Sequence, residues 1–168
     1  MPERKDKYSN LVFDEVTESG TDTLTFEAVD LGLSAQDRVG VLIHRLEWSK
    51  WELGLADDTD RIEFGLSASN GWATVAASEQ SIITFIRKNV TEIGTAASAL
   101  VWSIPEVQDF TTFPGGGILI VPRPLYLFIK GTNLATAQTV AMRMYFTLVT
   151  LKPEEYFELL ETRTYFAG

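Results

Sequence analysis

Hydrophobic and polar positions along much of this chain alternate with the two-residue period of β-strands, most densely over residues 117–151. There the runs GILIV, PLYLFIKG and TVAMRMYFTLVTL follow one another with little helical periodicity. Such closely spaced runs predict half-buried to fully buried strands. In GILIV and MRMYFTLVTL apolar residues occupy both alternating faces, so a sheet packed on one side only would leave apolar area in water. Another sheet, a helix or a neighbouring subunit must therefore cover the second face.

Similar patterns predict further strands upstream. In one of these strands, residues 39–51, regular alternation places His44 on the same face as Leu46 and Trp48. The connection over residues 105–117 contains Pro114 and three glycines, which predicts a long loop. The other upstream strands are expected over residues 11–16, 23–28, 61–67 and 99–104.

Two segments have features of helices. In residues 81–89, Ile82 and Ile86 have i,i+4 spacing, which favours a short helix that Ser78 could cap, although the β-branched content leaves a strand open. Near the end of the chain, Pro153 fits the first turn of a helix and is followed by two glutamates and several apolar residues. We therefore expect a C-terminal helix over residues 153–162, which could cover one apolar face of the preceding strands.

These elements together predict an all-β fold: an antiparallel β-sandwich of jelly-roll type with about eight strands and a short C-terminal helix. The chain has 168 residues, of which 45% are hydrophobic and 22% charged, as expected for one globular domain. We expect that domain over residues 11–168. Residues 1–10 are polar with alternating charges and predict a flexible N-terminal arm.

Composition narrows the classes of function. The net charge of −9 repels nucleic-acid phosphates, and the arm is too weakly basic to bind a genome alone. The absence of cysteine excludes disulfides, thiolate nucleophiles and cysteine-based zinc sites. No apolar run approaches the roughly 18 residues of a membrane span, and the first residues lack the apolar core of a signal peptide. We therefore expect a soluble chain.

Candidate chemistry is sparse, and we predict no catalytic residue, cofactor or metal site. His44 is the only histidine, whereas a cupin-type jelly-roll enzyme needs several metal-binding histidines, so we interpret it as structural. An acidic turn contains Asp57, Asp58 and Asp60, and whether it binds a divalent cation stays open. Paired carboxylates such as Asp57 and Glu63 leave an enzyme as a third hypothesis, although nothing in the sequence fixes their separation.

Two other groups of residues are candidates for binding. Trp48 and Trp72 could stack on sugar rings, which motivates the alternative hypothesis of a carbohydrate- or ligand-binding β-sandwich module. Arg143 interrupts an apolar face in the last strand. It could form an intersubunit ion pair, with Tyr145 and Thr147 in the same candidate subunit contact, while a solvent-exposed guanidinium on an apolar stem stays open as the alternative.

The order of elements resembles single jelly-roll capsid proteins of small icosahedral viruses, archaeal ones among them. About eight short strands with long connections in the middle precede the long strand TVAMRMYFTLVTL and a helical tail. This resemblance implies two four-stranded sheets and a terminal arm used in subunit contacts. It implies a self-assembling coat protein without enzymatic activity, located in the virion after assembly in the host cytoplasm. Its partners would be copies of itself and other virion proteins, whereas the weakly basic arm argues against direct genome contact.

Overall fold

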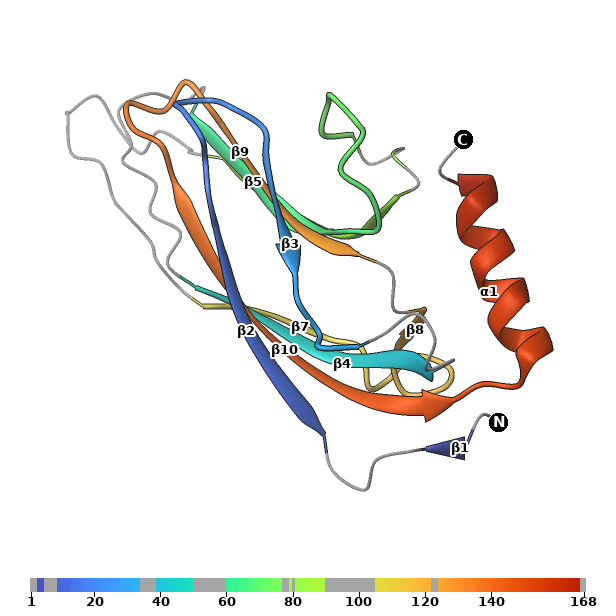
Figure 1. The fold of residues 1–168 in the computed structure, drawn as a ribbon. Coiled ribbons are helices and arrows are strands. Elements are labelled where there is room, and N and C mark those ends of the chain that lie inside the picture. Colours follow the sequence, from blue (N-terminus) through green and yellow to red (C-terminus); the bar gives the residue numbers. More distant parts are fainter. Residues whose placement is uncertain are drawn as a thin grey trace.

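In the computed structural model the described residues form two antiparallel sheets packed face to face, with one helix at the C-terminal end (Figure 1). This arrangement confirms the predicted all-β sandwich. The structure describes residues 3–4, 9–33, 39–49, 60–76, 79, 81–89, 105–121 and 124–166.

The strands divide into a six-stranded and a four-stranded sheet. The six-stranded sheet contains β1 (Glu3–Arg4), β2 (Asn10–Thr17), β4 (Val39–Ser49), β7 (Glu106–Asp109), β8 (Ile118–Ile120) and β10 (Thr139–Thr150). The four-stranded sheet contains β3 (Thr25–Val29), β5 (Arg61–Ser67), β6 (Ile82–Asn89) and β9 (Leu125–Thr132). The helix α1 spans Pro153–Phe166.

Strand pairing is nested from the ends of the chain toward its middle. β2 pairs with β10, β3 with β9, β4 with β7 and β8, and β5 with β6, all antiparallel. This is the pairing of one long hairpin rolled up on itself, which defines a jelly roll. Two further pairings, β10 with β4 and β9 with β5, close each sheet across the roll. The predicted jelly-roll topology is therefore confirmed.

The core lies between the inner faces of the two sheets. Trp48 on β4 and Phe64 on β5 are fully buried, and their ring centroids lie 5.3 Å apart, which joins the sheets at the centre. Around them pack aliphatic and methionine side chains from alternate strand positions. The largest of these are Ile43, Leu46, Ile62, Leu66, Leu125, Leu127, Ile129, Met142 and Met144.

β4 contains a β-bulge, so the prediction of which residues share a face of this strand is wrong at His44. Tyr145 of β10 pairs with Arg45 and the next residue, Phe146, pairs with Ile43, so His44 is an extra residue. The bulge shifts the alternation by one position. His44 therefore does not share a face with Leu46 and Trp48, as regular alternation predicts. The residues that reach the core on either side of the bulge are Val41, Ile43, Leu46 and Trp48.

Two segments differ from the expected elements. The predicted helix at residues 81–89 is wrong, because this segment forms β6 and pairs with β5 along its length. Its β-branched residues favour the strand, and the Thr84 hydroxyl also accepts a hydrogen bond from the Leu66 backbone N–H. The expected loop at 105–117 contains the short strand β7 before its glycine turn. Ser78 and the expected strand at 99–104 lie outside the described residues.

The N-terminal segment also contributes to a sheet. Glu3 and Arg4 form β1, which pairs with Thr150 and Val149 at the end of β10. β2 begins at Asn10 and pairs with the first part of β10. Part of the predicted arm is therefore built into the six-stranded sheet.

Helix α1 covers one end of the outer face of the six-stranded sheet. Tyr156 is buried there, and Leu159 packs beside it against the strands. Glu155 accepts a hydrogen bond from the Lys152 N–H at 3.0 Å, which satisfies a backbone donor at the start of the helix. The helix thus covers a face that the alternation had left apolar. The strand residues beneath it are Leu42, Leu119, Val121 and Val149, with Leu151 just after β10.

A buried carboxylate joins two connections at one end of the sandwich. Glu18, which follows β2, is 4% exposed, and its two oxygens accept hydrogen bonds from the N–H groups of Gly131 at 2.6 Å and Gln138 at 2.9 Å. Nearby, Asp22 accepts from the N–H groups of Asn133 and Leu134. These acceptors fix the β2–β3 connection to the end of β9 and to the β9–β10 connection.

We expect Glu18→Gln to lower the free energy of unfolding by roughly 1.5–3 kcal/mol, because an amide keeps one acceptor and places a donor against a backbone N–H. Urea denaturation of the purified protein measures this loss. Glu27→Gln, at an exposed position on β3, is the matched control. Equal stability of the two variants would contradict the role of Glu18.

Candidate functional site

Among the described residues, no element covers the outer face of the six-stranded sheet at the end away from α1. Four adjacent strands, β2, β10, β4 and β7, present outward side chains there in two cross-strand rows. We call these eight residues the open face. The first row is Phe13, Arg143, Glu47 and Val107, and the second is Leu11, Tyr145, Arg45 and Asp109.

The open face has charged residues in the middle and apolar residues toward both edges. Leu11 and Phe13 on β2 are 58% and 53% exposed, and Val107 on β7 is 46% exposed. In the middle, Arg45 and Glu47 form an ion pair at 2.7 Å. Exposed large apolar side chains gathered on one face are unusual for a surface in contact only with water.

Tyr145 connects the two charged residues of β4. Its hydroxyl donates to Glu47 Oε2 at 3.3 Å, and the Arg45 guanidinium lies 5.9 Å from its ring centroid. Arg143 is exposed, and within the described part of the chain it has no ion pair or hydrogen bond from its side chain. In the middle of the open face, Arg45, Glu47 and Tyr145 are therefore held by contacts with one another, whereas the Arg143 guanidinium has no side-chain partner among the described residues.

The structure brings together two of the three candidate subunit-contact residues. Arg143 and Tyr145 both lie on the open face. Thr147 is on the same side of β10 but is only 3% exposed, and its hydroxyl lies 2.9 Å from His44 Nε2. Thr147 is therefore a buried structural residue, because the His44 side chain covers it.

His44 ties the turn before β8 to the sheet. Its Nδ1 lies 2.8 Å from the Gly116 carbonyl oxygen, which can only accept, so Nδ1 carries the proton. In the neutral ring Nε2 then accepts from the Thr147 hydroxyl. Gly115 and Gly116 have φ angles of 90° and 78°, which glycine adopts without strain. These contacts give His44 a structural role.

Asp109 lies at the outer end of the second row. Its carboxylate accepts a hydrogen bond from the Thr111 hydroxyl at 2.6 Å and another from the Thr111 backbone N–H at 2.9 Å. These two hydrogen bonds, together with the positive charge of Arg45 and a smaller effect of His44, hold the pKa of Asp109 below its ordinary value. Asp109 therefore remains an anion at the rim of the open face.

The two candidate ligand-stacking tryptophans are packed within the fold. Trp48 is fully buried and donates its indole N–H to Gln108, so it is a core residue with no ring face open to a ligand. Trp72 is half-buried against the four-stranded sheet, where its ring packs edge-on against Phe26 and Phe128. Its N–H donates to Ser67 Oγ and the Ser69 carbonyl. Trp72 thus holds the β5–β6 connection on the sheet.

Two of the acidic candidates, Asp60 and Glu63, lie among the described residues. Asp57 and Asp58 lie outside the described residues, and Asp60 is buried. Glu63 is also buried, and it accepts from Arg87 Nε at 2.6 Å, so its carboxylate is engaged in an ion pair. Among the described residues no group of three or more histidine or acidic side chains could hold a metal ion.

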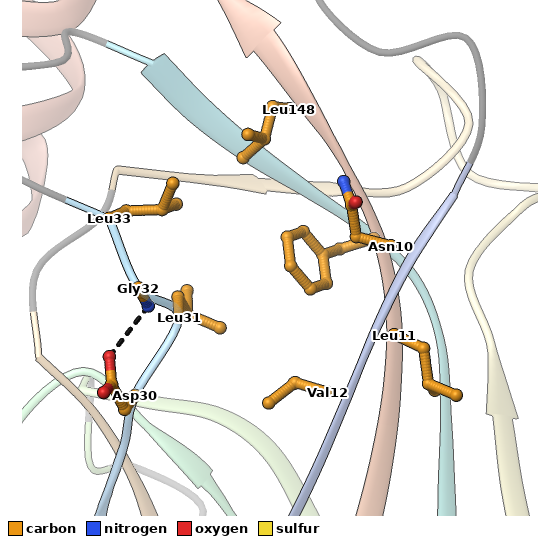
Figure 2. A pocket seen from close by; sticks show the side chains of 9 residues that line it. Asn10, Leu11, Val12, Asp30, Leu31, Gly32, Leu33 and Leu148 are labelled. Carbon is orange, nitrogen blue, oxygen red and sulfur yellow. Dashed lines mark hydrogen bonds between the residues drawn. The ribbon is translucent and has the colours of Figure 1, made fainter.

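A pocket of about 450 Å³ opens at the edge of the sandwich between β2 and the segment that follows β3. Figure 2 shows Val12, Leu31, Leu33 and Leu148 around it, with Leu11 directed to the other side of β2. Of its polar residues, Asp30 accepts a hydrogen bond from the Gly32 N–H at 2.7 Å. The pocket can admit an apolar group, but its lining offers no pair of groups suited to acid–base or nucleophilic catalysis.

Sequence reasoning missed most of the open face, including Leu11, Phe13 and Val107. The one local signal was the expected strand over residues 11–16, because Leu11 and Phe13 lie on the opposite face of such a strand from Val12. Which side of that strand faces water depends on its pairing with β10.

Comparison with known proteins gives no relative from which a function could be transferred. No protein-family description matches the chain, and no curated protein matches it. Across the described residues, no helix combines the length and apolarity that crossing a membrane requires.

His44→Leu should lower the free energy of unfolding by about 1–3 kcal/mol, because it leaves the buried Thr147 hydroxyl and the Gly116 carbonyl without their partner. Chemical denaturation followed by tryptophan fluorescence measures the change. The double variant His44→Leu/Thr147→Val removes both side-chain partners and should recover part of the loss. A double variant that is less stable than His44→Leu would argue against this hydrogen bond.

Thr111→Val should raise the pKa of Asp109 toward its ordinary value of 3.8, because it removes the hydroxyl that stabilises the carboxylate. An NMR titration of the Asp109 side-chain carboxyl measures the shift. With its native pKa lowered, Asp109 contributes stability above its unfolded pKa and loses it as the pH falls through the native pKa. Thr112→Val, a change at the exposed neighbour, should leave the titration unchanged. An unmoved Asp109 pKa in Thr111→Val would assign the shift to the Thr111 backbone N–H, which the variant retains, and to Arg45.

Proposed function

We propose that this protein is a structural subunit that assembles with copies of itself, and that it serves as a virus coat protein in an icosahedral shell. The observation that carries the proposal is the distribution of exposed large apolar side chains over separate parts of the surface. They lie on both flanks of the six-stranded sheet, in the turn after β7 and on α1. These residues are Leu11, Phe13, Val107, Phe113 and Phe157.

Such a distribution suits a subunit with several neighbours. An exposed apolar side chain loses its unfavourable hydration when a partner covers it. A closed shell requires each subunit to contact neighbours on more than one side, whereas a simple dimer needs one patch. Phe113 and Phe157 lie outside the open face, so the molecule offers apolar contact groups in more than one place.

The fold is compatible with this function without requiring it. Jelly rolls occur in viral capsid proteins, in lectins and in cupins, so the site must decide among them. Cupin-type metal chemistry would need several histidines, and the sole histidine here is engaged by the Gly116 carbonyl and Thr147. A sugar-stacking platform would need open tryptophan faces, and Trp48 is buried. Assembly is therefore the function that the surface favours.

In this proposal the partners are other copies of the chain and further virion proteins, and the location is the virion. The acidic net charge of −9 makes direct contact with the genome unfavourable. The subunit would then form the wall of the shell and leave the neutralisation of nucleic acid to other components.

We expect the purified full-length protein to form particles or rings, visible by negative-stain electron microscopy, as the protein concentration rises. Phe113→Ser/Phe157→Ser should reduce particle formation by at least tenfold, because it removes two apolar contacts outside the open face. The neighbouring exposed changes Thr112→Ser/Glu158→Gln are the matched control.

The same samples should be compared across salt concentration, pH and divalent cation concentration. Protein that stays free of particles and rings in all of these conditions would exclude a shell subunit that assembles unaided. A double variant that assembles like wild type would remove Phe113 and Phe157 from the contacts.

A further inference from the structure

We propose that the open face forms a two-fold contact with a second copy of this chain. This inference rests on the proposed function of self-assembly and specifies one of its contacts. The key observation is the order of side chains across the first row. Phe13, Arg143, Glu47 and Val107 run from β2 to β7 as apolar, cation, anion and apolar.

Read in the opposite direction, this row places an apolar residue opposite an apolar residue and an anion opposite a cation. When a second copy is turned over about an axis parallel to the strands, between β10 and β4, each row meets the same row in reverse order. Arg143 then faces Glu47 of the second copy, and Phe13 faces Val107 of the second copy. Because the contact is two-fold, each of these pairs occurs twice. The result is a charged centre flanked on both sides by apolar pairs.

The second row supports the same axis. Reversal places the ring of Tyr145 against Arg45 of the second copy, which repeats between molecules the cation–π contact that the two residues make within one molecule. The outer positions, Leu11 and Asp109, do not match chemically. Asp109 is held as an anion by Thr111, so it belongs at the hydrated rim of the contact.

The central residues are available for such a contact. Arg143 is exposed without a side-chain partner among the described residues, whereas the Glu47 side chain is 24% exposed and fixed by Arg45. A positioned carboxylate and a free guanidinium suit an intermolecular pair that sets the register of the contact. Helix α1 covers the other end of this face and leaves both rows open.

Charge reversal tests the contact directly. Arg143→Glu places carboxylate against carboxylate across the two-fold axis, and Glu47→Arg places guanidinium against guanidinium. Each variant alone should associate with itself roughly 100-fold more weakly than wild type, as measured by sedimentation velocity. Lys152→Glu changes the charge by the same amount as Arg143→Glu outside the open face, so it should leave the association unchanged.

Two rescues separate the contact from a general loss of stability. An equimolar mixture of Arg143→Glu and Glu47→Arg should form mixed dimers, because each carboxylate of one variant meets a guanidinium of the other. The double variant Arg143→Glu/Glu47→Arg should recover self-association, because the carboxylate at position 143 again faces a guanidinium at position 47 of the second copy. Thermal melting checks that every variant is folded.

The outcomes distinguish failure of the two-fold contact from failure of the proposed shell function. Wild-type protein that is monomeric, single variants that associate normally, or a mixture and double variant that fail to associate would each overturn the contact. If Arg143→Glu still forms particles, the open-face contact is not needed for the shell. That result would overturn the contact and support the proposed function. Dimers that respond to charge reversal without any particles would support the contact and contradict the shell.

Discussion

The pairing of β10 with β2 on one side and β4 on the other is the interaction on which the rest of this structure depends. It closes the roll by joining the last strand to the first long one, and it carries part of the core through Met142 and Met144. The outer face of β10 has three different environments. Val149 lies beneath α1, Thr147 beneath His44, and Arg143 in the open. One strand therefore determines the core, the anchorage of the helix and the surface proposed for assembly.

The sequence predicted elements well where a local pattern had one interpretation. β5 spans the predicted residues 61–67, and the terminal helix begins at Pro153. Prediction was wrong where two patterns coincided. In residues 81–89 the i,i+4 spacing of isoleucines suggested a helix, but pairing with β5 made the segment a strand. Local spacing contains no information about a partner strand, and here the partner decided the outcome.

The candidate site was predictable only in part, because local patterns identify single residues but not the strands that lie beside them. Arg143 stands out in the sequence because a charge interrupts an apolar run, and in the structure it is exposed on the open face. Thr147 has the same parity as Arg143 and Tyr145, yet it is buried by His44, a residue distant in sequence that the bulge displaces. Leu11 and Val107 join the face only through strand pairing, which no local pattern specifies.

The bulge in β4 also shows that His44 plays no part in the alternation of inward and outward residues along this strand. If this residue were removed, Ile43 would be followed directly by Arg45, and the segment from Val41 to Trp48 would alternate inward and outward without interruption. The hydrophobic register of the sandwich is thus independent of the histidine. Its position is an insertion that anchors the turn before β8, so the anchor of that turn and the hydrophobic pattern of the sheets are set by different residues.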